Sequence, residues 1–316
     1  MESTIPGEDL PECFSKYYEI EKVIQFPNED SFIKNWVVLA RKTDLQLPFH
    51  QCVGNNYQED EFSKQENEYK IILKVFQNSQ DSQFSFFHEV EALSDAKLNG
   101  INYVPNIYAT GMIISKHEYL IIEMEYVPGE PFLPQNKQQV IKYFSMILDC
   151  LEKMNNLNWN HCDIKPEHIY LRKPSDRICI LDWGSALNFV CDDPEEIVYC
   201  IGTKPFLAPE RIQTDINSKN GDVFSLGMLL YRWISGNEPN YDHDPNDKFC
   251  IKYFNWIQRF YQNILSNNYL PDETILKKDN DQEFIEKIFE ILRATCNMIS
   301  QKRISIQEFV ILFQNL

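Results

Sequence analysis

Apolar residues follow two different periods along this chain, and the dominant period changes after the first third. Short runs rich in β-branched and aromatic residues predict strands at 17–24, 36–41, 69–76 and 118–127. The last run ends at Pro128-Gly129, a dipeptide typical of a turn. The first third of the chain is therefore predicted to be rich in β-structure.

Apolar residues occur at helical spacing over 83–93 and again over most of the chain after residue 130. A long amphipathic helix is predicted from apolar residues at helical spacing, namely Val140, Phe144, Ile147, Leu148, Leu151 and Met154. Residues 222–235 are apolar on nearly all sides, which predicts a buried helix that starts at Asp222 and stops at Gly236. A last helix is predicted over 304–313.

Strands that come first and helices that follow predict an α+β fold with a small β-rich lobe and a larger helical lobe. We place the first lobe at 17–124 and the second at 125–316, after a loose arm at 1–16. Residues 42–68 are rich in Asn, Gln, Asp and Glu without an apolar period, which predicts a long exposed loop inserted in the first lobe.

The segment 161–171, HCDIKPEHIYL, combines a carboxylate with a cation outside any predicted helix. Asp163 stands two residues before Lys165, and Asp182-Trp183-Gly184 follows an apolar strand predicted at 178–181. Loop-borne aspartates with a lysine between them suit phosphoryl transfer: one carboxylate orients a hydroxyl nucleophile, another holds magnesium, and the lysine stabilises the phosphoryl charge.

These residues resemble the protein-kinase family. The segment 161–168 resembles its catalytic loop HRDxKPxN, and Asp182-Trp183-Gly184 resembles its DFG motif. By this resemblance Asp163 and Lys165 are the candidate catalytic residues, and Asp182 is a candidate metal ligand. The implied fold is the two-lobed protein-kinase fold over 17–316.

The resemblance extends toward the N-terminus in the family's order. Lys74 in IILKVF is similar to the strand lysine that holds the nucleotide phosphates, and Glu89 is similar to its ion-pair partner. Glu91 is the weaker candidate, because the family places a leucine four residues after the pairing glutamate, as Leu93 is here. Residues 124–127, MEYV, resemble the hinge that presents backbone groups to adenine, which makes Glu125 and Val127 candidate ATP-binding residues.

The resemblance to the protein-kinase family also extends toward the C-terminus. Ala208-Pro209-Glu210 matches the family's APE motif, with Thr203 before it in the segment that shapes a peptide platform. Asp222 resembles the buried aspartate that braces the catalytic loop, and Arg303 resembles the late arginine that pairs with Glu210. Lys165 and Thr203 are similar to the serine/threonine branch of the family.

The resemblance implies an ATP-dependent protein serine/threonine kinase that uses Mg²⁺, with Mn²⁺ as a second candidate ion. Two other classes stay open: a pseudokinase that acts as a scaffold or regulator, with or without bound nucleotide, and a small-molecule kinase with the same core. Thr203 and the APE motif argue against the last class, because they belong to a platform for peptides.

Three departures from the family pattern bear on activity. The phosphate-covering loop, expected at 24–37, contains no glycine, although glycine lets backbone N–H groups approach phosphate closely. Cys162 replaces the HRD arginine, so activation through an activation-loop phosphate is not expected. His168 replaces the catalytic-loop asparagine, either as a nitrogen ligand for the second metal or as a histidine that only hydrogen-bonds a neighbouring backbone group.

The composition and net charge limit the classes of partner that this protein is expected to bind. A net charge of −17 and a pI of about 4.8 argue against nucleic-acid binding through a positive field. Glu130 and Glu167 stand where related kinases contact basic substrates, which suggests a basic protein substrate, although both can equally be solvated carboxylates. Nine cysteines without a CxxC pair and the lack of a long apolar run predict an intracellular protein, cytoplasmic or nuclear, without a membrane span. The sequence does not indicate an oligomeric state.

Overall fold

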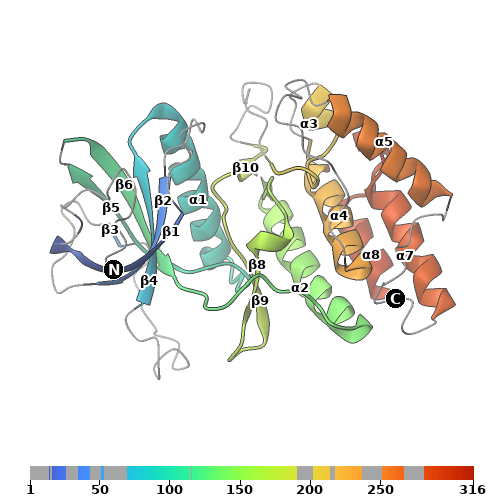
Figure 1. Ribbon diagram of the computed structural model, residues 1–316, viewed down its shortest axis with the longest axis horizontal. Coiled ribbons are helices and arrows are strands. Elements are labelled where there is room, and N and C mark those ends of the chain that lie inside the picture. The colour runs from blue at the N-terminus through green and yellow to red at the C-terminus, as the bar shows by residue number, and fades with distance from the viewer. Residues whose placement is uncertain are drawn as a thin grey trace, which may run out of the picture. The chain divides into compact units, whose positions relative to one another are not determined.

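The computed structural model describes residues 14, 16–25, 35–42, 51–52, 70–114, 116–190, 202–213, 218–236, 251–266 and 281–316 (Figure 1). The chain divides into two compact units. The N-terminal unit holds the described parts of Met1–Lys97 and Pro105–Pro128, and the C-terminal unit those of Leu98–Val104 and Gly129–Leu316. The lobe limits predicted at residues 124 and 125 stay a prediction.

The N-terminal unit is built on one six-stranded antiparallel sheet in the order β1-β2-β4-β6-β5-β3. Its strands, in chain order, are β1 Tyr18–Gln25, β2 Asn35–Lys42, β3 Gln51–Cys52, β4 Lys70–Gln77, β5 Ile107–Ile114 and β6 Glu118–Glu125. Central strand β4 is largely buried, because it has a hydrogen-bonded strand on each side and carries apolar residues on both faces.

One helix, α1 (Gln80–Leu98), packs against this sheet (Figure 1). Phe86 on α1 meets Phe76 on β4 edge to face, with ring centroids 5.9 Å apart. Glu89 lies on the same buried side of the helix as Phe86 and Leu93. The helical period that predicted α1 therefore also turns Glu89 toward the sheet.

Helices make up most of the C-terminal unit: α2 Lys137–Asn156, α3 Glu210–Gln213, α4 Gly221–Ser235, α5 Ile251–Leu265, α7 Gln282–Thr295 and α8 Ile306–Gln314. Two two-stranded antiparallel sheets pair β7 (Trp159–Asn160) with β10 (Leu187–Asn188) and β8 (Ile169–Arg172) with β9 (Arg177–Ile180). Phe144 of α2 is buried against Trp233 of α4 and Phe313 of α8. This aromatic core fixes the helices that flank the loop at 161–168.

The predicted α+β class is confirmed, and the structure corrects three details. Strand β5 was missed, because Thr110 and Gly111 interrupt its apolar run. The loop predicted over 42–68 contains β3, whose backbone pairs with β5; residues 53–69 lie outside the described ranges. Asp222 does not cap α4: the cap position is Asn220, and the Asp222 carboxylate bonds backbone amides of another segment.

None of the helices in the described ranges combines the length and apolar character that a bilayer crossing requires.

Candidate active site

In the N-terminal unit, Lys74 and Glu89 form a buried ion pair. The Lys74 ammonium donates to both carboxylate oxygens of Glu89, at 2.7 and 2.9 Å, and the two residues are 6% and 0% exposed. Glu91 is exposed on the other side of α1. A buried ammonium needs such a partner, because an unpaired charge in this environment is strongly unfavourable.

The hinge candidates also lie in this unit. Glu125 ends β6, its amide donates to the Asn106 carbonyl at 2.9 Å, and its carboxylate accepts from the Asn106 side chain at 3.0 Å. Val127 follows and is buried. Residues 26–34 of the expected phosphate-covering loop lie outside the described ranges.

In the C-terminal unit, Asp222 holds the loop at 161–168 by its backbone. Its two carboxylate oxygens accept from the amides of His161 and Cys162, at 2.6 and 2.9 Å. Burial raises the pKa of Asp222, while these two hydrogen bonds and the charge of Arg211 act in the opposite direction. Cys162 has a φ of 67°, a left-handed conformation that a non-glycine residue adopts only where its surroundings hold it.

Asp163, Lys165 and Thr203 form a closed triangle of hydrogen bonds. Thr203 Oγ1 donates to Asp163 Oδ1 at 2.7 Å, and Lys165 Nζ donates to Asp163 Oδ2 at 2.9 Å and to Thr203 Oγ1 at 2.8 Å. Burial raises the pKa of Asp163, but the charges of His168 and Lys165 and the hydrogen bonds of Lys165 and Thr203 outweigh this and lower it below its usual value. The carboxylate is therefore ionised at neutral pH.

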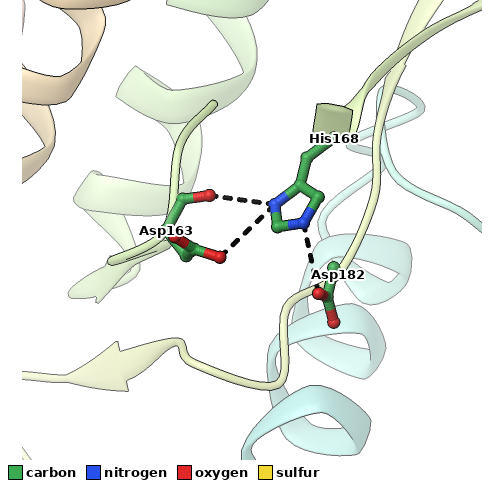
Figure 2. Close-up of side chains that lie close together, drawn as sticks. All are labelled: Asp163, His168 and Asp182. Carbon is green, nitrogen blue, oxygen red and sulfur yellow. Dashed lines mark hydrogen bonds and ion pairs between the residues drawn. The ribbon is translucent and has the colours of Figure 1, made fainter. Parts of the chain in front are cut away.

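His168 lies between Asp163 and Asp182, as Figure 2 shows. Its Nδ1 is 2.9 Å from the Asp163 carbonyl oxygen, and its Nε2 is 3.2 Å from Asp182 Oδ2. Because a carbonyl oxygen only accepts hydrogen bonds, Nδ1 carries the proton in that contact. Both interpretations of His168 are thus compatible with one ring: Nδ1 bonds the backbone, while Nε2 faces a carboxylate.

These three residues are the candidate metal ligands of the site. One ligand atom each from Asp163, His168 and Asp182 can be chosen so that all lie within 4.8 Å of one another. The set offers carboxylate oxygen and imidazole nitrogen, a combination that suits Mn²⁺ and similar transition ions as well as, or better than, Mg²⁺. Asp182 itself has a φ of 63°.

The histidine at the start of the loop was not singled out from the sequence, although it lies inside the motif. His161 Nε2 donates to the Leu181 carbonyl at 3.0 Å, and its Nδ1 accepts from the Asp163 amide at 3.2 Å. Its ring also packs against Trp183, with centroids 4.6 Å apart. The indole Nε1 of Trp183 donates to the Ile180 carbonyl at 3.0 Å, a contact that phenylalanine cannot make.

Glu210 and Arg303 are joined by a bidentate ion pair. Arg303 donates to both carboxylate oxygens of Glu210, at 2.7 and 2.5 Å, and its Nη1 also reaches the Asn220 carbonyl at 3.1 Å. The guanidinium lies over the Phe224 ring, 5.1 Å from its centroid. Arg303 therefore ties the segment that ends at Glu210 to the start of α4.

Comparison with known proteins agrees with this arrangement. The family described as "Protein kinase domain" matches residues 60–311. Among curated proteins, the chain is 29% identical over 185 residues to the striated muscle preferentially expressed protein kinase of Danio rerio, which covers 55% of this chain and 6% of that protein. It is 29% identical over 148 residues to serine/threonine-protein kinase grp of Drosophila melanogaster, with 44% and 28% coverage.

A third relative, the probable serine/threonine-protein kinase fhkD of Dictyostelium discoideum, is 27% identical over 245 residues, which cover 70% of this chain. The matched segment is 30% of that relative's length. The chain thus spans less than a third of each of these three relatives.

We predict that His161 makes folding stability depend on pH. Burial, reinforced by the charge of His168, lowers its pKa to about 4, against the opposing effects of Asp163, Asp182 and the Leu181 carbonyl. Between that value and the unfolded pKa of about 6.5, the unfolded chain binds a proton that the native chain does not. The contribution of His161 to the free energy of unfolding should therefore be fully present above about pH 6.5. It should be lost as the pH falls toward 4, by on the order of 3 kcal/mol over the whole window.

Urea denaturation at pH 7.5 and pH 5, in EDTA, measures this loss. His161→Asn should lose clearly less free energy of unfolding between the two pH values than the wild type, whereas His117→Asn, at an exposed histidine, should behave like the wild type. Equal losses in the wild type and His161→Asn would show that other groups cause the pH dependence.

Proposed function

The chain belongs to the protein kinase family, and on that premise we propose that it is an ATP-dependent serine/threonine kinase. In this proposal it transfers the γ-phosphoryl group of ATP to a hydroxyl group of a protein substrate. The observation that carries the proposal is the Asp163–Lys165–Thr203 triangle, which presents an ionised, hydrogen-bonded carboxylate beside a cation. A protein that only binds partners has no chemical need for this arrangement.

Each residue has a distinct proposed role. Asp163 orients the substrate hydroxyl and takes its proton, while the hydroxyl oxygen forms a bond to the γ-phosphorus and the bond to the ADP oxygen breaks. Lys165 stabilises the negative charge on the moving phosphoryl group. Lys74, oriented by Glu89, holds nucleotide phosphates, and the backbone at Glu125 and Val127 contacts adenine.

Asp182 and His168 are the proposed metal ligands. Their facing oxygen and nitrogen fit a divalent ion, because Nδ1 of His168 is already committed to the Asp163 carbonyl and leaves Nε2 for ligation. A bound Mg²⁺ or Mn²⁺ would neutralise phosphate charge. Nε2 of His168 lies 3.2 Å from Oδ2 of Asp182.

A basic protein segment is the substrate that we propose. Glu130 and Glu167 are exposed in the C-terminal unit, and the chain as a whole carries a net charge of −17. Complementary charge speeds encounter and suppresses binding of acidic competitors. We further propose an intracellular location, cytoplasmic or nuclear, since four described cysteines are buried free thiols: Cys150, Cys162, Cys179 and Cys296.

The alternative is a pseudokinase scaffold, and the absence of glycine at 24–37 favours it. Such a protein would share the fold and could still bind nucleotide. It differs from the enzyme in one measurable property, the transfer of phosphate to protein.

We predict that Asp163→Asn abolishes transfer but preserves ATP binding, because Asp163 serves the nucleophile and not the nucleotide. Radiolabelled ATP with myelin basic protein, histone or casein measures transfer. Thermal shift measures binding: ATP at 100 times Kd stabilises by about 2.7 kcal/mol, or roughly 5–10 °C. Asp149→Asn, the same change on the outer side of α2, is the matched control and should transfer like the wild type.

A wild type that binds ATP without transferring phosphate would favour the scaffold over the enzyme. Full transfer by Asp163→Asn would show that the assigned role of Asp163 is wrong.

We predict that the metal preference depends on His168. Imidazole nitrogen suits Mn²⁺ better than Mg²⁺, so the wild type should transfer faster with Mn²⁺, and His168→Asn should raise the Mg²⁺-supported rate. Pulsed EPR of bound Mn²⁺ provides a readout independent of activity: the ¹⁴N coupling of a ligated imidazole should be present in the wild type and in His117→Asn, and lost in His168→Asn.

If His168 only bonds the backbone, no ¹⁴N coupling appears. His168→Asn then changes the Mg²⁺ rate by less than about twofold, which is under about 0.5 kcal/mol of barrier.

A further inference from the structure

Arg211 is a buried cation that the assigned roles leave unexplained. It belongs to the four-residue helix α3, directly after Glu210, and is 5% exposed. Its Nη1 donates to the backbone carbonyl of Cys162 at 2.9 Å, across 49 positions of sequence. A buried guanidinium is costly unless it has hydrogen-bond acceptors, and the Cys162 carbonyl of the loop is one of them.

The contact completes a clamp on residue 162. The Cys162 amide donates to Asp222 of α4, and the Cys162 carbonyl accepts from Arg211 of α3. The backbone N–H and C=O groups of Cys162 are therefore both fixed by charged side chains from two different helices. Cys162 is also in the left-handed conformation, with a φ of 67°, which L-residues leave readily when nothing holds them.

Two small residues make room for the guanidinium. Cys162 has a short side chain, and Arg211 acts on its thiol by charge and by a hydrogen bond that oppose the burial which raises the thiol pKa to about 12. Gly202 is close to the same contact: a Cβ there would be 3.0 Å from the Cys162 carbonyl oxygen, 3.4 Å from Arg211 Nη1 and 2.8 Å from Leu207 Cδ1. Gly202 also has a φ of 121°, so a side chain would be strained as well as crowded.

We propose that Arg211 is a positioning residue that holds the peptide before Asp163 and so fixes where the Asp163 carboxylate points. Through this contact Arg211 joins the segment that carries Thr203 and Glu210 to the loop. Position 162 of this sequence carries no arginine. The effect on catalysis rests on the proposed function, whereas the effect on the loop does not.

Hydrogen exchange tests the structural part in the absence of substrate. Arg211→Met keeps the apolar stem and removes the guanidinium. In peptides that cover 159–164, it should speed amide exchange by about tenfold, because the loop opens locally. Peptides from α2 should be unchanged, and Arg259→Met, at an exposed arginine of α5, should resemble the wild type throughout.

Unchanged exchange at 159–164 would overturn the proposal. So would equal acceleration in every peptide of the unit, since Arg211 would then support the unit as a whole. Arg211→Lys, which keeps the charge, covers the case in which Arg211→Met fails to fold. In Arg211→Lys, amide exchange at 159–164 alone should be faster than in the wild type but slower than in an unprotected peptide. Exchange at the wild-type rate there would also overturn the proposal.

Kinetics test the catalytic part. A misplaced Asp163 should lower kcat by about tenfold or more, because small errors in position are costly, while the KM for ATP should change less than about twofold. Arg211→Lys should recover part of kcat. A raised KM with unchanged kcat would contradict the assigned role. If the wild type transfers no phosphate, the proposed function fails, and the exchange experiment still decides whether Arg211 holds the loop.

Discussion

The geometry of the candidate active site depends on the buried carboxylate of Asp222. Its two oxygens take the amides of His161 and Cys162, which fixes two successive peptides and holds Cys162 in a left-handed conformation. Once this turn is set, the Asp163 amide meets the His161 ring and its carboxylate meets Lys165 and Thr203. Removing the Asp222 carboxylate would leave buried N–H groups unpaired, a loss that usually exceeds the value of the bonds themselves.

The second constraint is electrostatic. Asp163 is largely buried, and a buried carboxylate tends to protonate unless cations and donors surround it. Lys165 and Thr203 supply them by hydrogen bonds, so the pKa of Asp163 stays below its usual value. His161 meets the opposite demand: it must stay neutral to donate from Nε2 and accept at Nδ1, and burial lowers its pKa to about 4. All these groups belong to one compact unit, the C-terminal unit.

Sequence patterns predicted what depends on local order or on motif spacing. The helical period indicated α1, the family resemblance indicated Glu89, and the apolar run before Gly236 indicated α4 and its stop. Contacts between distant segments were predicted only where the family resemblance supplied them, as for Lys74 with Glu89 and Arg303 with Glu210. Nothing near Arg211 indicates that its side chain reaches Cys162, and motif matching could not say which ring nitrogen of His168 faces Asp182. Those outcomes depend on tertiary packing, which a linear pattern does not encode.

The central claim, which belongs to the proposed function, is that charged groups of this chain hold the loop at 161–168 without a phosphate on the activation loop. Treating the purified protein with phosphatase, removing the phosphatase and comparing initial rates of phosphoryl transfer before and after treatment tests this most directly. The account predicts rates that agree within about twofold, equivalent to less than about 0.5 kcal/mol of barrier. A loss of tenfold or more, reversed when the protein is phosphorylated again, would contradict it, because the loop would then need a phosphate that Asp222 and Arg211 do not replace.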